Sequence, residues 1–153
     1  MCLSRIIGKN PLRIADEDII CYRGVQVNAD DWDSLKVWWQ RKRGRYNNYT
    51  TYFQMAPVVI GETFIAQPVL RPAKLEWIDC NEGELNGGFV HSFKNKKDAI
   101  EFARWRSHVD VVECIIPAGT PYFEGWNHDG SDGYASTKLK YVKVINPWKF
   151  SWL

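Results

Sequence analysis

The stretch VDVVECIIP, from Val109 to Pro117, decides the fold class that the sequence predicts. It is an almost continuous apolar run, broken only by Asp110 and Glu113. Such a run, rich in β-branched residues, is typical of a strand at the centre of a sheet that is covered on both faces. We therefore expect a sheet built around this segment.

Further segments before and after this run also have the composition of strands. They combine β-branched and aromatic residues and are bounded by residues that favour turns. The predicted strands are Asp18–Val27, Thr50–Met55, Val58–Ala66, Lys74–Ile78 and Leu139–Ile145. The last of these alternates as a half-buried strand does, whereas Gly61 predicts a bulge or hairpin within 58–66.

Two segments carry helix signals. Residues 30–43 begin with aspartates, end with cations and precede Gly44. One face of this predicted helix carries Trp32, Leu35, Trp39 and Lys42. The second helix follows the stretch from Gly87 to Ser92, read as a glycine-containing turn whose backbone N–H groups could meet a phosphate. Asn95 is expected to cap this helix through its side-chain oxygen.

These elements predict an α+β fold, a single compact domain spanning residues 1–153 with a mixed, mostly antiparallel sheet and two or three helices. The length of 153 residues suits one domain, and 45% hydrophobic with 25% charged residues is close to the globular average. Residues 1–17 are interpreted as an N-terminal arm. No repeat or long linker divides the chain.

Cysteine usage and the N-terminus indicate the compartment. The four cysteines form no CxxC pair and have no histidine at zinc-ligand spacing, so we expect no metal site. Cys21 and Cys114 lie in apolar, strand-like runs and are expected to be small buried side chains. No run approaches the roughly 20 apolar residues of a membrane helix, and no signal peptide is visible. The protein is expected to be cytoplasmic, in a reducing environment, without a membrane partner.

Motifs of the common enzyme classes do not occur in the sequence. It contains no GxSxG, P-loop, HExxH or dinucleotide GxGxxG pattern, and its histidines are scattered. We therefore expect no catalytic residues and no cofactor. The stretch Gly125–Gly133 is read as a glycine-rich loop that could close over a ligand, with Trp126 and Tyr134 near its ends.

Positive charge and aromatic residues alternate after the first helix. Arg41 to Arg45 precede Tyr46, Tyr49 and Tyr52, an arrangement found in proteins that bind single-stranded nucleic acid. A basic helix end that complements the helix dipole gives the same pattern without a partner. Because the net charge is only +2, nucleic acid is not required as a partner, although it is not excluded.

Four motifs carry a resemblance to known proteins. They are CYRG at 21–24, GFVHSF at 88–93, VVECIIPAGTPYF at 111–123 and YASTKLKYVKVI at 134–145. Their order resembles that of small uncharacterised proteins from bacteria and their phages. Residues 30–71 look like an insertion that is atypical of that family. This resemblance implies no activity.

A more distant similarity is to ADP-ribosyltransferase-like folds. In that family an Arg or His on the first strand and a serine motif on a later strand hold NAD, and a glutamate on a late strand orients the ribose. Arg23 and Ser92, with His91, match the first two features. The third has no match in residues 134–145, and Glu113 and Glu124 are the nearest carboxylates.

We expect a non-enzymatic binding or accessory protein, phage-related, with a pocket for an anionic nucleotide-like ligand. Its arginine would bind phosphate, its hydroxyls would form hydrogen bonds and its aromatic rings would stack on a base. The predicted ligand-binding residues are Arg23, His91, Ser92, Trp126, Tyr134 and Ser136. The alternative is that these side chains serve only a structural role, in pairing with an acid, bonding to backbone or filling the core.

Two other functions stay open. The first is an ADP-ribosyltransferase-like enzyme acting on NAD through Glu113 or Glu124. The second is a structural or interaction protein that contacts a protein partner through Trp38–Trp39 and the tail 148–152, because aromatic residues concentrate at interfaces.

Overall fold

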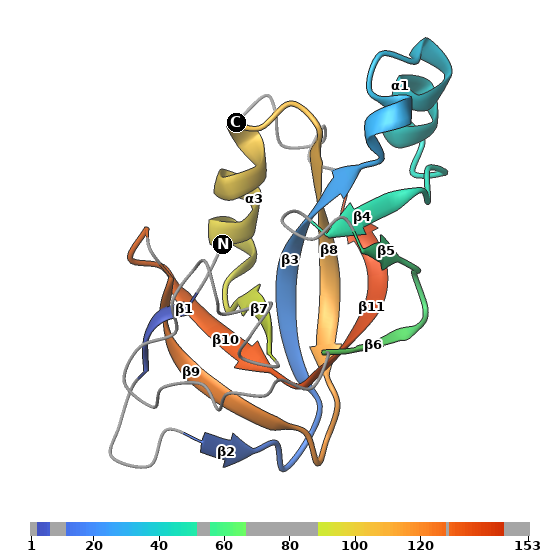
Figure 1. Cartoon of the computed structure of the whole chain (residues 1–153). Helices are drawn as coiled ribbons and strands as arrows, with labels where there is room; N and C mark the ends of the chain where they lie inside the picture. Colours follow the sequence, from blue (N-terminus) through green and yellow to red (C-terminus); the bar gives the residue numbers. More distant parts are fainter. Residues whose placement is uncertain (1–2, 7–11, 52–55, 67–88, 128, 146–153) are drawn as a thin grey trace.

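One sheet dominates the fold (Figure 1). The computed structural model describes residues 3–6, 12–51, 56–66, 89–127 and 129–145, and every structural statement below refers to these residues. The sheet contains eleven strands. They are β1 (Leu3–Ile6), β2 (Leu12–Ile14), β3 (Ile19–Val27), β4 (Tyr49–Thr51), β5 (Pro57–Val58), β6 (Thr63–Ile65), β7 (Val90–Phe93), β8 (Val109–Ile116), β9 (Pro121–Asn127), β10 (Asp132–Ser136) and β11 (Lys138–Ile145). Two helices accompany it, α1 (Leu35–Lys42) and α3 (Lys96–Arg104), with a short 3-10 turn, η1 (Ala29–Asp31).

The strand order places β8 between β3 and β11, near the middle of the sheet. The full order is β1-β9-β10-β7-β3-β8-β11-β6, with β2 on β9, β4 on β3 and β5 on β4. All pairings between the described strands are antiparallel. The described residues fit the expected α+β class only loosely, because the sheet dominates and two helices accompany it. The sheet was expected to be mixed, but its described pairings are antiparallel throughout.

Strand β3 changes its partner along its length. On one side it pairs with β8 from Ile19 to Gln26. On its other side it pairs with β7 at Tyr22 and with β4 from Val25 to Val27. The sheet therefore forks at Arg23 and Gly24, and Figure 1 shows β9 and β10 running at a steep angle to β3, β8 and β11.

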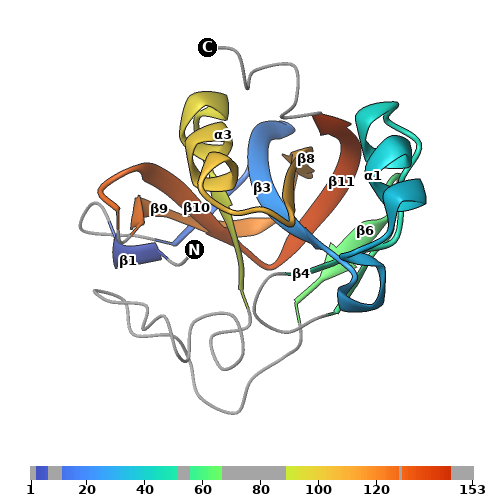
Figure 2. The ribbon, with the colours of Figure 1, turned by 90° about the horizontal axis from the view of Figure 1, so that it is seen from above.

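The two faces of the sheet have different coverings. We call the face that carries Tyr22, Phe93 and Val111 the helix face, because α3 packs on it through Ala99 and Ala103. Figure 2 shows α3 beside the sheet, apart from α1. Gly24 permits this packing, since a Cβ there would lie 2.7 Å from the ring of Phe102. The opposite face, which we call the core face, contributes the larger apolar cluster. That cluster includes Cys21, Val25, Val112, Cys114, Leu139 and Tyr141.

The first predicted helix is shorter than expected. Residues 30–43 divide into η1 and α1, and α1 begins only at Leu35. Ser34 explains the break, since its backbone is extended and its side chain accepts a hydrogen bond from Val37 N. The indole of Trp32 donates instead to Val27 O at 2.8 Å, which holds the preceding turn against the end of β3.

The expected corner before the second helix is also corrected. His91 and Ser92 lie inside strand β7, and the chain turns only after Phe93. Asn95 precedes α3 without a side-chain capping bond, and its amide nitrogen donates to Asp98 Oδ2 at 3.4 Å. The glycines 87 and 88 lie outside the described residues.

The predicted loop 125–133 is largely a tight hairpin. Strand β9 continues to Asn127 and β10 starts at Asp132, so Trp126 and Tyr134 belong to strands. Their places in the ladder fix both residues, and the predicted closing loop is thus wrong.

Two strand predictions need smaller corrections. In β11 the register shifts between Tyr141 and Lys143, so the expected regular alternation ends at a bulge. At Gly61, which has a φ of +92°, the chain turns, but β5 pairs with β4 and β6 pairs with β11, so the two strands do not form a hairpin with each other.

Some predictions fall on residues that the structure does not describe. These are the strand 74–78, the end of the strand 50–55 and the tail 148–152. Within the described ranges, neither helix is long and apolar enough to cross a membrane.

Candidate functional site

The predicted ligand-binding residues divide between the two faces of the sheet. Ser92 lies opposite Tyr134 in the β7–β10 ladder, whereas His91 lies opposite Ala135. Because successive side chains of a strand point to opposite faces, His91 is on the helix face and Ser92 on the core face. The core face carries Arg23, Ser92, Trp126, Tyr134 and Ser136.

A row of polar side chains crosses the core face of the sheet. Tyr22 is paired with Phe93, so extending that register by one residue places Arg23 beside Ser92. Ser92 is paired with Tyr134, and Tyr134 with Glu124. We call Arg23, Ser92, Tyr134 and Glu124 the polar row. At the usual strand separation it extends about 14 Å between its terminal Cα atoms.

The arginine of this row is almost fully buried. Arg23 is 3% exposed and lies where β3 changes partner from β7 to β4. Its Nη1 donates to the backbone oxygen of His91 at 3.3 Å. That oxygen belongs to β7 next to the fork, so the guanidinium bridges the two strands where their pairing ends. His91 thus contributes through its backbone.

The hydroxyl residues Ser92 and Tyr134 of the polar row are buried as well, and so is Ser136, which lies on the same face outside the row. Ser136 Oγ donates to Lys138 O at 2.9 Å, which accounts for it structurally. Ser92 Oγ has no hydrogen bond of ordinary geometry to a described residue. Burial raises the pKa of the neighbouring Cys21 thiol to about 12, and the interaction of that thiol with Ser92 lowers it by less. Burial likewise raises the pKa of Tyr134, while nearby Lys94 lowers it.

The two candidate carboxylates lie on opposite faces. Glu124 is on the core face in the polar row, where Lys94 Nζ binds it at 2.8 Å and Arg13 at 3.3 Å. Its hydrogen bond is the main reason why the pKa of Lys94 is raised. Glu113 is paired with Tyr22, on the helix face, and binds Lys143 at 3.7 Å. Only Glu124 can therefore act on the same ligand as Arg23.

No metal centre emerges from the residues that the structure describes. No group of three His, Cys, Asp or Glu side chains among them is placed to hold an ion. His128 lies outside these residues. Cys21 and Cys114, neighbours across β3 and β8, are free thiols.

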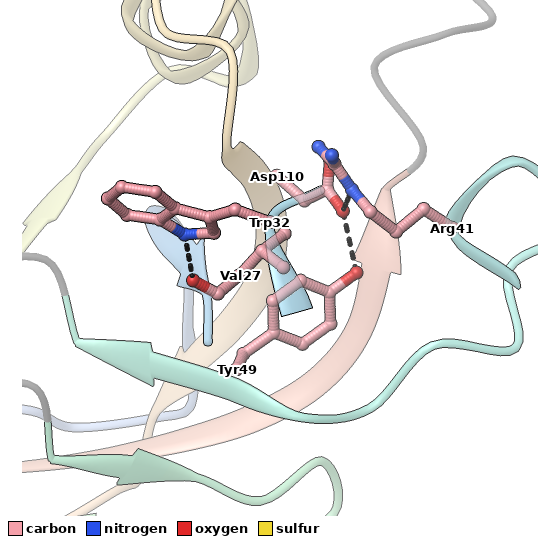
Figure 3. Close-up of polar contacts among 5 residues, drawn as sticks. All are labelled: Val27, Trp32, Arg41, Tyr49 and Asp110. Carbon is pink, nitrogen blue, oxygen red and sulfur yellow. Dashed lines mark hydrogen bonds and ion pairs between the residues drawn. The ribbon is translucent and has the colours of Figure 1, made fainter. Parts of the chain in front are cut away.

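A second buried polar cluster was missed by the sequence reasoning. Asp110 accepts two hydrogen bonds from Arg41, at 2.9 and 3.1 Å, and one from Tyr49 at 2.6 Å (Figure 3). Asp110 is 1% exposed. Burial is the largest influence on both partners: it raises the pKa of Tyr49, as Asp110 also does, and it lowers that of Arg41, which the hydrogen bond and charge of Asp110 nevertheless raise. This cluster fastens α1 to the start of β8. The acid within the apolar run 109–117 was the one sequence signal for it.

Comparison with protein-family models, with curated protein sequences and with solved structures found no match. The site is therefore interpreted from its own geometry.

Proposed function

We propose that the protein binds an anionic nucleotide-like ligand on the core face of β7, β9 and β10, as a non-enzymatic binding or accessory protein. The supporting observation is the position of Arg23, a buried guanidinium at the fork of the sheet, beside Ser92 and in line with Tyr134. A forked donor, a hydroxyl and an aromatic ring are the groups that phosphate, sugar and base require.

The charges around the polar row favour an anion. Lys94 and Arg13 reach the same face and are exposed by 43% and 49% at their side chains. Both contact Glu124, which they share, so the two cations face a single carboxylate. The phosphate of a nucleotide that approaches from solvent is attracted to these cations. The base of the same nucleotide can lie against Trp126, which is 36% exposed.

A second candidate function is ADP-ribosyl transfer or NAD hydrolysis. Glu124 favours it, because this carboxylate shares the face of Arg23 and Ser92. A ligand with two phosphates and two sugars is long enough to reach from one end of the row to the other. In this second case Glu124 stabilises the positive charge that develops on the ribose.

A thermal-shift panel tests the proposal. The probes are NAD, ADP-ribose, ATP and inorganic phosphate. A ligand present at 100 times its dissociation constant adds about 2.7 kcal/mol to the free energy of unfolding, so a clear shift is expected for at least one nucleotide. The shift should disappear in Arg23→Lys and shrink in Tyr134→Phe, which keeps the ring and changes the fold least. If both variants show a shift as large as that of the unmodified protein, the site is refuted.

The two candidate functions are separated by the carboxylates. If the protein is an enzyme, NAD turnover is lost in Glu124→Gln and kept in Glu113→Gln, since Glu113 lies on the other face. Binding without turnover in the unmodified protein supports the first function.

A further inference from the structure

Helix α1 exposes two large apolar side chains and buries a cation. Leu35 is 71% exposed and Trp39 44%, whereas Val37 and Arg41 are 8% exposed. A surface helix normally turns its apolar stripe to the core and its charges to solvent. In α1 Asp110 holds Arg41 inside, so that the stripe formed by Leu35 and Trp39 is left on the outside. Exposed large apolar side chains gathered on one element mark interaction surfaces.

The charge of this region is strongly one-sided. No Asp or Glu occurs from Ser34 to Gly61. The cations of the segment are Lys36, Arg41, Lys42, Arg43 and Arg45. Of these, Arg41 is bound by Asp110, and the other four are exposed. A chain with a net charge of only +2 thus concentrates positive charge on α1 and the turn that follows it.

The cations and the indole rings are interleaved. Lys42 Nζ lies 5.0 Å from the ring centroid of Trp38 and 5.4 Å from that of Trp39. The guanidinium of Arg43 lies 5.5 Å from the Trp39 ring. The two indoles meet edge to face at 5.0 Å. Aromatic rings interleaved with cations form surfaces on which unpaired bases stack, next to charges that bind phosphate.

The surface is held in place before any partner arrives. The Arg41–Asp110–Tyr49 cluster fixes the inner side of α1, and the Trp32 indole donates a hydrogen bond to Val27 O (Figure 3). The same indole stacks on His108, with ring centroids 4.7 Å apart. Figure 1 shows α1 projecting beyond the end of β3, away from β7, β9 and β10. A fixed platform loses less entropy when it binds than a mobile one.

We propose that α1 and its following turn bind single-stranded nucleic acid, with Trp39 as the stacking platform and Lys42, Arg43 and Arg45 as phosphate contacts. A polyanion matches the acid-free stretch 34–61, and unpaired bases match the exposed indole, which neither a free phosphate nor a duplex backbone would use. This surface is distinct from the polar row around Arg23, and the proposal does not depend on the nucleotide site proposed there.

Fluorescence anisotropy with labelled oligothymidylate and oligouridylate tests the proposal at low and at physiological salt. Trp39→Ala is expected to weaken binding about tenfold, the usual effect of losing one base–aromatic stack. Trp105→Ala is the matched control, because Trp105 is 77% exposed and lies near Arg104, but on α3. It should leave the affinity unchanged. The slope of log affinity against log salt is negative, and Lys42→Gln and Arg43→Gln should each make it less steep by about 0.7.

Several outcomes would overturn the proposal. No anisotropy change with either oligonucleotide at low salt refutes it. Equal losses in the Trp39 and Trp105 variants show binding by general charge without the platform. Recruitment to vesicles that contain phosphatidylserine, with no oligonucleotide binding, assigns the surface to lipid. Circular dichroism of each variant confirms that its fold is intact, which these exposed substitutions should leave unchanged.

Discussion

The buried carboxylate of Asp110 gives the most direct energetic prediction. Asp110→Asn keeps the shape of the side chain but removes its charge, and it turns an N–H group toward donors from Arg41 and Tyr49. The side chains of Arg41 and Asp110 are 7% and 2% exposed, so water cannot replace the lost bonds. Breaking a buried ion pair costs about 3–5 kcal/mol. We expect a loss of about 3 kcal/mol, a large part of a typical domain's stability.

Urea unfolding at neutral pH measures this loss. Tyr49→Phe removes one hydrogen bond to a charged acceptor and should cost about 1.5–3 kcal/mol. Glu113→Gln is the matched control on the same strand, because its partner Lys143 is 66% exposed, and its cost should stay below about 1 kcal/mol. Hydrogen exchange in α1 should also accelerate in Asp110→Asn. A cost for Asp110→Asn no larger than that for Glu113→Gln would refute the role of this cluster.

Two further predictions concern stability. Burial raises the pKa of Cys21 to about 12 and that of Cys114 well above its ordinary value, so above about pH 9 the unfolded chain loses protons that the folded chain keeps. Both thiols therefore stabilise the fold below that pH, and the free energy of unfolding should fall by up to about 1.4 kcal/mol per pH unit for each of them as the pH rises further. Urea titrations across this range check it, Cys114→Ala should flatten the slope, and constant stability up to about pH 11 would contradict it. Gly133→Ala should lower the melting temperature more than Gly24→Ala does. At Gly133 the new Cβ would lie 2.9 Å from the backbone oxygen of Ser92, whereas at Gly24 it would meet the ring of Phe102, which can move at a cost of about 1–3 kcal/mol. Equal melting temperatures for the two variants would show that the backbone between β7 and β10 yields as easily as a side chain.

The central strands were predictable because they are dense in apolar residues. The run 109–117 became β8, because burial on both faces over most of a strand leaves a continuous apolar signal. The stretch 18–27 became β3, as its β-branched and aromatic residues indicated. The start of α1 was not predictable from charge. Aspartate and serine are both good caps, so Asp30 and Ser34 each suit the first position. Ser34 caps α1, and the hydrogen bond from Trp32 to Val27 O, which no local pattern encodes, holds the turn before it.

The candidate site was predictable in composition but not in its geometry. Five of the six predicted side chains share a face, yet the reading of His91 and Ser92 as a corner hid the alternation that separates them. Likewise the glycines 125, 130 and 133 made a hairpin look like a loop, which hid the position of Glu124 beside Tyr134. The bond between Arg41 and Asp110 joins residues 69 positions apart, and no local pattern encodes such a pair.

A nuclear magnetic resonance titration of the ¹⁵N-labelled protein with ADP-ribose tests the proposed nucleotide site most directly. If ADP-ribose binds on the core face, the amide signals that move most belong to the polar row and its neighbours in β7, β9 and β10, with little change in α1. Arg23→Lys should remove these changes. Signals that stay in place at millimolar ligand, or that move only on the helix face, would contradict a nucleotide site on the core face.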